Sequence, residues 1–229
     1  MKFDIILQCR TKSKRLPNKI FYKIGKSTIL EILISNLKKI NQANKIIIAV
    51  SFNDDLKKFR KIAKKNNVDL FVNTKGINEN DVLSRFYNCS KKYKSENIIR
   101  ITPDCPFINI EMVKNMINFY KKKKLLFLTN NKPRYVPHGF DCEIIHYSIL
   151  KSAKLKSKSK YEREHVTPWI YKNYFKNKNN IKIINKDYSN IRITIDILQD
   201  YLFFLKNDKL LKKISTEKNF IKNLKKLEI

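Results

Sequence analysis

Short apolar runs alternate with amphipathic segments along the first 129 residues of the chain. The runs have the length of β-strands and are rich in Ile, Leu and Val; they cover residues 3–8, 45–50, 68–72, 97–102 and 125–129. The segments between them carry apolar residues three and four positions apart, which predicts helices over 29–40, 56–63, 81–93 and 110–120. The pattern therefore predicts a series of strand–helix units.

Strands that are apolar on both faces are typical of a parallel sheet covered by helices on each side. Alternating strands and helices with right-handed crossovers predict an α/β fold with a doubly wound, mostly parallel sheet. Such a sheet binds ligands beyond the carboxyl ends of its strands. Candidate functional residues are therefore expected in the loops that follow the strands.

The regular pattern fades between residues 130 and 169, and residues 132–143 are rich in proline, aromatic and ionisable side chains. Such a stretch indicates a functional insertion that leaves the sheet. Regular patterns then return, with strands expected over 181–184 and 191–195 and helices over 198–205 and 216–227, the last with Thr216 as its N-cap. We expect one domain over 1–229, with the insertion at about 130–170.

The chain is strongly basic, with 50 Lys and Arg against 20 Asp and Glu and a net charge of +30. A phosphate-rich partner, a membrane surface or a nucleic acid would each match that charge. Only eight of the basic residues are Arg, however, and the lysines are scattered over every segment, whereas a nucleic-acid groove concentrates Arg, Lys and aromatic residues on one face. We interpret the charge as a solvated basic surface and expect no specific nucleic acid. A nucleic-acid-binding protein is the alternative of another class.

Other features indicate a reduced, cytoplasmic setting. The longest apolar runs are far shorter than the ~20 residues of a membrane span, and residues 1–10 lack the pattern of a secretory signal. Cys9, Cys89, Cys105 and Cys142 form no C-x-x-C pair. We therefore expect buried, reduced thiols rather than a zinc or redox site.

The loop after the first expected strand is a candidate anion site. Residues 8–19 hold Arg10, Ser13, Arg15 and Lys19 among further lysines. Guanidinium groups and backbone N–H groups match the oxygens of a triphosphate, which carries about four negative charges. The alternative is an ordinary solvated loop in a lysine-rich chain.

Two acidic residues lie where expected elements begin or end. Asp104 follows the fourth strand between Pro103 and Pro106, so a rigid turn would hold its carboxylate at the crevice. Asp81 and Arg85 lie at the start of an expected helix, and the alternative for Asp81 is a simple first-turn position on that helix.

The irregular stretch and the residues beside it hold a second polar group. Asp141 and Glu143 alternate, so an extended backbone would place both carboxylates on one face, where they could bind sugar hydroxyls. His138 precedes them, and Arg163 and His165 follow within residues 161–167. Because the two histidines are 27 residues apart and no cysteine pair accompanies them, zinc is disfavoured; structural histidines are the other alternative.

These segments, in this order, resemble the cytidylyltransferases that activate sugar acids as CMP-sugars. The matching stretches are R-T-K-S-K-R-L-P-N-K at 10–19, N-D-V-L-S-R-F at 80–86, R-I-T-P-D-C-P at 100–106, H-G-F-D-C-E at 138–143, Y-E-R-E-H-V-T at 161–167 and R-I-T-I-D-I-L-Q-D at 192–200. The family includes CMP-KDO and CMP-sialic-acid synthetases, and the chain is most similar to its spore-coat-polysaccharide-type branch. The resemblance covers nearly the whole chain.

The resemblance implies a Rossmann-like nucleotidyltransferase that transfers CMP from CTP to an acidic sugar and releases pyrophosphate. It implies catalytic roles for Arg10, Lys19 and Asp104. It also implies nucleotide contacts from Arg10, Ser13, Arg15, Lys19, Asp81 and Arg85, sugar contacts from His138, Asp141, Glu143, Arg163 and His165, and Mg²⁺ binding by Asp104 and Asp196. The matching region in the family reaches a neighbouring subunit, so a homodimer is expected.

The chain departs from the family pattern at two places. Lys12 stands where a glycine is common, and Ile197-Leu198-Gln199 replace a Thr-Pro-Glu, which removes a proline that starts a helix. Asp196 and Asp200 on either side are retained. A related sugar nucleotidyltransferase that uses another nucleotide or a phosphorylated acceptor is the nearest alternative.

Overall fold

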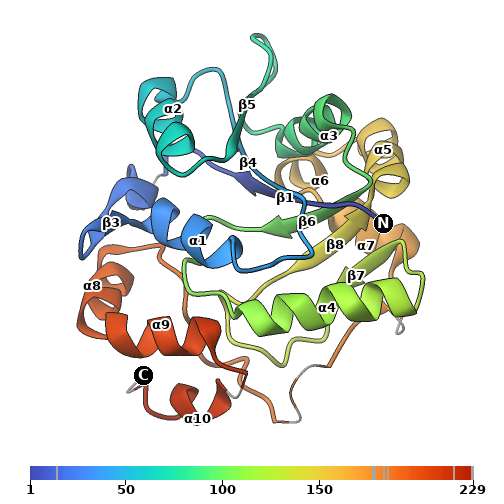
Figure 1. The fold of residues 1–229 in the computed structure, drawn as a ribbon. Coiled ribbons are helices and arrows are strands. Elements are labelled where there is room, and N and C mark those ends of the chain that lie inside the picture. Colours follow the sequence, from blue (N-terminus) through green and yellow to red (C-terminus); the bar gives the residue numbers. More distant parts are fainter. Residues whose placement is uncertain (14, 177–178, 183, 185, 219, 228–229) are drawn as a thin grey trace.

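The chain folds around a six-stranded, mostly parallel sheet (Figure 1). The computed structural model describes residues 1–13, 15–176, 179–182, 184, 186–218 and 220–227. The strand order is β5-β4-β1-β6-β8-β7, from β1 (Phe3–Gln8), β4 (Lys45–Val50), β5 (Asp69–Val72), β6 (Asn97–Ile101), β7 (Phe127–Thr129) and β8 (Glu143–His146). The pairs among β5, β4, β1 and β6 are parallel, whereas β8 is antiparallel to both of its neighbours.

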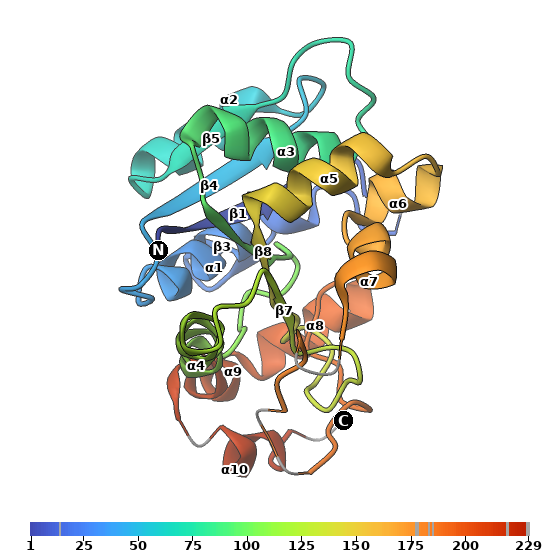
Figure 2. The ribbon, with the colours of Figure 1, turned by 90° about the vertical axis from the view of Figure 1, so that its right-hand side faces the viewer.

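Helices cover both faces of the sheet because its strands are apolar on both faces. Successive residues of a strand point to opposite faces, and along β1 Ile5 and Leu7 belong to one core cluster while Ile6 belongs to the other. Figure 2 shows the resulting layers, with α3 and α5 on one side of the sheet and α1, α4 and α9 on the other. The predicted doubly wound α/β fold is confirmed.

Helix boundaries follow the capping residues. Thr28 and Glu31 form a reciprocal capping box at the start of α1, and Asp55, Asp81 and Asn109 accept a backbone N–H at the starts of α2, α3 and α4. The helices are α1 (Ile29–Leu37), α2 (Leu56–Lys65), α3 (Val82–Tyr93), α4 (Ile110–Lys122), α5 (Tyr147–Lys156), α6 (Lys160–His165), α7 (Pro168–Tyr174), α8 (Leu198–Lys206), α9 (Asp208–Thr216) and α10 (Ile221–Leu224). A 3₁₀ turn, η1 (Lys19–Phe21), and the hairpin β2 (Lys23–Ile24) and β3 (Ser27–Thr28) precede α1.

The sequence predicted that the irregular stretch leaves the sheet. This is wrong for part of it, because one segment of the stretch is a strand of the sheet. Residues 143–146 form β8, which inserts between β6 and β7. Ile144 and Ile145 are fully buried on the two faces of the sheet, so β8 is an interior strand. Its apolar run is only two residues long and lies between the polar Glu143 and His146, which is too short to predict a strand. Helices α5, α6 and α7 follow it.

The C-terminal part differs from the prediction at three places. Residues 193–195 are buried, but residues 191–195 pair with loops and form no strand: Ile193 N donates to His138 O at 2.6 Å and Ile195 N to Asp104 O at 2.9 Å. The expected strand over 181–184 includes residue 183, which lies outside the described residues, and the described remainder forms no strand. Thr216 is the last residue of α9 and does not start a helix. The helix begins earlier than predicted, because Leu211 and Ile214 in its preceding turns are buried in the core.

Gly139 explains how residues 191–195 approach the turn at 138–139 so closely. It has φ of +103°, and a Cβ at this position would lie 1.9 Å from Ile193 O. Any other residue would push the segment that carries Asp196 away from the sheet.

Within the described residues, no helix is long and apolar enough to cross a membrane.

Candidate active site

Lys19 joins two carboxylates that are far apart in the sequence. Its Nζ lies 2.9 Å from Asp104 Oδ2 and 2.7 Å from Asp196 Oδ1, and it donates a third bond to Ile195 O at 2.7 Å. All three polar side chains are largely buried. Asp104 follows β6 and Lys19 follows the loop after β1, so this cluster lies at the carboxyl ends of adjacent parallel strands, where the fold predicts a ligand site.

Backbone contacts fix Asp196 in this place. Its N–H donates to Asp200 Oδ2 at 2.7 Å, and the same oxygen accepts the N–H of Ile197 at 3.0 Å, so Asp200 caps the start of α8. The cap replaces the helix-starting proline that the family pattern has here. The substitution at 197–199 therefore leaves the carboxylate of Asp196 in the crevice.

Cations surround Asp196. Besides Lys19, Arg15 lies 3.2 Å from Oδ1 and Arg192 lies 2.5 Å from Oδ2. Partial burial opposes the charged form of Asp196, but the hydrogen bonds and positive charges of Lys19, Arg192 and Arg15 outweigh it and lower its pKa to about 2. The carboxylate is therefore ionised throughout the neutral pH range.

The Asp104 and Asp196 pair also fits a magnesium ion. Both carboxylates converge on one atom, Lys19 Nζ, so their oxygens can face a common cation. Mg²⁺ is commonly held by one or two carboxylates, with phosphate oxygens and waters completing its shell. No group of three or more His, Cys, Asp or Glu that could hold a metal gathers in the described part of the chain, so a metal here would rest on these two carboxylates and on substrate oxygens. The two residues that the resemblance pairs as metal ligands therefore lie together in the structure, although residues 191–195 do not form the strand expected before Asp196; their metal role stays a prediction.

A small recess lies on the other side of the first loop. It is lined by Arg10, Lys12, Ser51, Asp54, Glu79, Asn80 and Arg85. Asp54 ties the loop to the end of β4: its carboxylate accepts Thr11 N at 2.8 Å and Ser51 N at 2.8 Å. This clamp holds the backbone of Thr11 although Lys12 stands where the family has glycine.

Arg85 is the buried cation of this recess. Its side chain is 1% exposed and donates to Glu79 O at 2.6 Å, while its Nε and Nη1 have no hydrogen-bond partner among the described residues. Burial lowers the pKa of Arg85, although the nearby Asp54 opposes this effect. An unpaired buried guanidinium is costly, so it indicates a ligand that accepts hydrogen bonds here.

Arg163 is engaged far from the group at 138–143. Its guanidinium bonds Asp81 Oδ2 through Nε at 3.0 Å and Ser84 Oγ through Nη2 at 2.9 Å, which fastens α6 to the start of α3. Burial opposes the charge on Asp81, but hydrogen bonds from Ser84 and Arg163 lower its pKa. Asp81 and Arg163 were predicted to bind different substrates, and the structure brings them together.

Glu143 belongs to a buried network. It is 2% exposed, and its two oxygens accept hydrogen bonds from Arg100 at 2.6 Å and Tyr171 at 2.8 Å. Burial and the charge of Glu143 raise the pKa of Tyr171, so its hydroxyl stays protonated and donates. Glu143 thus lies inside the wall of the crevice, and it does not share its surroundings with Asp141.

Asp141 and His138 lie beside a further arginine. Arg134 Nη2 is 2.6 Å from Asp141 Oδ1, and its Nη1 is buried without a hydrogen-bond partner in the described structure. His138 pairs through its backbone with Ile191 and Ile193, next to Arg192. Burial and the charge of Arg134 lower the pKa of His138, so its ring is neutral at pH 7. His165 lies on the surface and packs against Tyr161, with the ring centres 4.5 Å apart and the ring planes tilted by 51°.

The remaining predicted residues lie at the mouth of the crevice. Arg10 is half-exposed and pairs loosely with Glu164 at 3.9 Å, and Ser13 Oγ accepts Leu16 N at 3.5 Å within the first loop. All four cysteines are free and buried, as predicted. Burial raises the pKa of each thiol.

Sequence reasoning missed Arg134, Arg192 and Asp54. A usable signal was the scarcity of arginine: there are only eight, and all except Arg60 line the crevice or anchor its walls. Arginine is retained where a planar, bidentate donor is needed, even in a chain that otherwise uses lysine.

The layered parallel sheet, the cationic loop after β1 and the paired carboxylates define an α/β nucleotidyltransferase. The chain belongs to the cytidylyltransferase family, since the sequence model of that family matches residues 5–228. It is therefore an enzyme that uses CTP as its nucleotide substrate.

Three proteins illustrate the relationship. The chain is 34% identical over 215 residues to the uncharacterized protein MJ1063 of Methanocaldococcus jannaschii, a match covering 91% of this chain and 84% of that protein. It is 27% identical over 174 residues to the spore coat polysaccharide biosynthesis protein SpsF of Bacillus subtilis, a match covering 72% of this chain and 68% of that protein. A cytidylyltransferase structure from Leptospira borgpetersenii superposes with a TM-score of 0.87 at 29% identity and covers 100% of this chain and 94% of that one.

Proposed function

We propose that this cytidylyltransferase condenses CTP with an acidic sugar to give a CMP-sugar and pyrophosphate. The observation that carries the proposal is the Lys19 ammonium held between Asp104 and Asp196 beside two arginines. Similarity to SpsF supports a product used in surface polysaccharide synthesis, and we place the enzyme in the cytoplasm.

The triphosphate would bind where cations now neutralise carboxylates. Lys19, Arg15 and Arg192 all contact Asp196 in this structure, and each can turn to phosphate oxygens once the carboxylates hold Mg²⁺. A bound Mg²⁺ would neutralise charge on the phosphates and polarise the α-phosphorus. The three cations would then stabilise the negative charge that passes to the leaving pyrophosphate.

The cytosine ring would lie over the small recess lined by Ser51, Asp54 and Arg85, with its carbonyl oxygen directed into it. The unpaired Nε and Nη1 of Arg85 are donors that suit the carbonyl oxygen of a pyrimidine. Arg10, at the edge of the same recess, lies between the base and the phosphates along the first loop.

The acceptor would bind beside Arg134, His138 and Asp141. The buried, unpaired Nη1 of Arg134 suits an anionic group, and the Asp141 carboxylate suits hydroxyls. The oxygen of a sugar hydroxyl attacks the α-phosphorus and forms a new P–O bond, the bond to the bridging oxygen breaks, and the hydroxyl proton is released together with the leaving pyrophosphate. Positioning and charge stabilisation supply most of the catalysis in such a transfer.

A pyrophosphate-release screen tests the proposal. CTP, UTP, ATP and GTP would each be combined with Mg²⁺ and with nonulosonic acids, octulosonic acids, a neutral sugar and a sugar phosphate. We expect release with CTP and one of the sugar acids. Release with the sugar phosphate alone would show that the anion beside Arg134 is a phosphate and would replace the acidic-sugar proposal with the phosphorylated-acceptor alternative.

A further inference from the structure

Helix α8 is apolar on two opposite sides although it lies on the surface. On its inner side Phe204 is buried, and Tyr201 packs on the core and donates to Lys23 O at 2.6 Å. On its outer side four apolar side chains are exposed, which we call the α8 stripe: Ile197, Leu198, Leu202 and Leu205. The three leucines are 51, 54 and 41% exposed and recur at helical spacing, so they form one continuous row.

A row of this kind is unusual on a soluble surface. Scattered exposed apolar residues are ordinary, but contiguous ones mark an interaction surface. The inner side of α8 already supplies the contacts that hold the helix on the domain. The leucines of the outer side therefore contribute little to folding.

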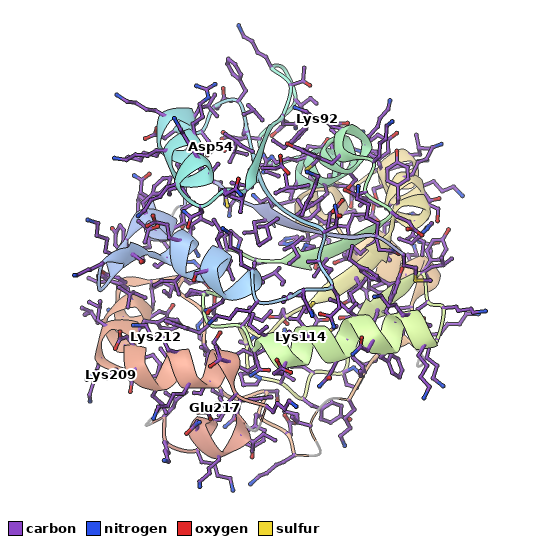
Figure 3. All side chains as sticks on the ribbon, viewed as in Figure 1. Asp54, Lys92, Lys114, Lys209, Lys212 and Glu217 are labelled. Carbon is purple, nitrogen blue, oxygen red and sulfur yellow. The ribbon has the colours of Figure 1, made fainter. Side chains whose placement is uncertain are left out.

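Lysines border the α8 stripe. Lys206 lies four positions after Leu202 on the same helix, and Lys209 follows at the start of α9. The β2–β3 hairpin, which Tyr201 contacts, carries the exposed Lys23 and Lys26. Figure 1 shows α8, α9 and the hairpin on one side of the molecule, and Figure 3 labels Lys209 and Lys212 there.

The carboxylates of this region are already neutralised. Asp200 caps α8 and lies 3.6 Å from Arg192, and Asp208 pairs with Lys212 at 2.7 Å. The border of the α8 stripe is consequently positive. A convex apolar row with a lysine border has the chemistry of a helix that lies in the interface of an anionic bilayer, where leucines enter the acyl region and lysines reach the headgroups.

We propose that the α8 stripe docks on the surface of a membrane rich in anionic lipids. Charge complementarity favours this occupant over a second copy of the chain at the α8 stripe, because self-association through this stripe would bring its two lysine borders together. Since α8 starts two residues after Asp196, docking would place the crevice beside the membrane and release the product there.

Vesicle flotation of the full chain tests the docking. Vesicles of phosphatidylcholine alone are compared with vesicles containing about 30% phosphatidylglycerol, at low and at high salt. We expect binding to the anionic vesicles only. The double variant Leu202→Ser, Leu205→Ser should lower the partition coefficient about tenfold or more, while Leu126→Ser, at a 48% exposed position before β7, should change it less than about twofold.

A matched pair of charge variants separates local from overall attraction. Lys206→Gln with Lys209→Gln and Lys61→Gln with Lys64→Gln remove the same charge, but the second pair lies on α2. The first pair should lower anionic binding about tenfold and the second much less. The CTP-induced rise in melting temperature should be unchanged in all variants, which shows that the fold and the nucleotide site are intact independently of any acceptor.

Equal losses for both lysine pairs, with no effect of the leucine pair, would overturn the proposal in favour of unspecific attraction by the net charge. A mass that doubles in solution and returns to the monomer value in the leucine variant would overturn it in favour of a second copy. Failure to bind anionic vesicles at low salt would overturn it directly.

Discussion

The ammonium of Lys19 lies 2.7 Å from Oδ1 of Asp196, although 176 residues separate them in the sequence. Lys19 also bonds Asp104, so one cation neutralises both carboxylates that are proposed to hold Mg²⁺. In the protein without substrate, this ammonium keeps two like charges together. The same contact accounts for much of the acidity of Asp196.

The low pKa of Asp196 predicts a stability change in acid. Its pKa is about 2 in the folded protein against an ordinary 3.8, so its contribution is present above about pH 4 and lost as the pH falls to about 2. The free-energy difference between the parent and Asp196→Asn should therefore shrink by about 2 kcal/mol over that range. Denaturant unfolding at a series of pH values measures it.

Lys19→Met supplies the control for this titration. Without the ammonium, the pKa of Asp196 should rise toward its ordinary value, and the difference from Asp196→Asn should depend less on pH; Arg192 and Arg15 account for the dependence that remains. If the parent's advantage persists unchanged at pH 2, the ion pair with Lys19 does not set the acidity of Asp196.

Asp104→Asn and Asp196→Asn should each lower CTP turnover by about 100-fold or more, because each removes a proposed metal ligand. The double variant should be far less than multiplicatively worse, since both act on one ion. Each substitution should also cost about 1–2 kcal/mol of stability. The carboxylates are not idle in the resting protein, because both bond Lys19.

Asp208→Asn, on the exposed side of α9, controls for a general effect of lost charge and should keep full turnover. Binding of Mn²⁺ in the presence of CTP, followed by electron paramagnetic resonance, reports the metal site without catalysis. Near-parental turnover in either active-site variant would rule out the two-carboxylate site.

The sequence was sufficient to predict the alternation of strands and helices up to residue 129, which follows from local patterns. Asp104 and Asp196 meet at Lys19, but a common strand edge is not the reason, because only Asp104 follows a strand and residues 191–195 bond to loops. β8 was missed because a four-residue strand between polar neighbours has too little periodicity to detect. The length of residues 191–195 suited a strand, but their hydrogen-bond partners are loops that no local pattern identifies.

The partners of the ionisable residues could not be predicted. The motif containing Arg163 suggested a sugar contact, whereas its guanidinium bonds Asp81 from another motif. Which charges meet depends on the path of α5 and α6 over α3, a tertiary feature. Glu143 similarly accepts hydrogen bonds from Arg100 and Tyr171. β6 and β8 place Arg100 and Glu143 opposite each other, and Tyr171 reaches the same carboxylate from α7.

Arg85→Met tests the proposed binding site of the cytosine ring. Removing a buried guanidinium whose Nε and Nη1 are unpaired among the described residues should leave the unfolding free energy within about 1 kcal/mol of the parent or raise it. The affinity for CTP should fall about 10- to 100-fold, because a charged hydrogen bond to the ligand is lost. Thermal-shift titration with CTP and UTP measures both, and parental CTP affinity would contradict the assignment. We expect the parent to prefer CTP.

The expected homodimer should show a solution mass near twice the 27.4 kDa of the chain by light scattering. Within the stretch 135–140, Val136 and Phe140 are buried in the protomer's own core, so we do not expect them at the interface. Exposed Leu155 and Tyr161 on α5 and α6 are the better candidates. Leu155→Glu should lower the mass to that of the monomer, whereas Leu126→Glu, an exposed leucine before β7, should not. A monomeric parent would refute the dimer.

Asp81 and Arg163 should behave as a structural pair that joins α3 to α6. A double-mutant cycle with Asp81→Asn and Arg163→Met should give a coupling of about 1–3 kcal/mol in unfolding free energy, because the pair is largely buried and both Nε and Nη2 of Arg163 donate to Asp81 Oδ2. Ser84→Ala should lose part of the same stabilisation, since Ser84 Oγ accepts from Arg163. If Arg163 instead binds the carboxylate of the acceptor, Arg163→Met will raise the acceptor KM strongly. The unfolding free energy will then stay at the parent's value, and the coupling energy with Asp81 will be near zero. Denaturant titration and acceptor-dependent pyrophosphate release, measured on the same four proteins of the cycle, separate these two roles.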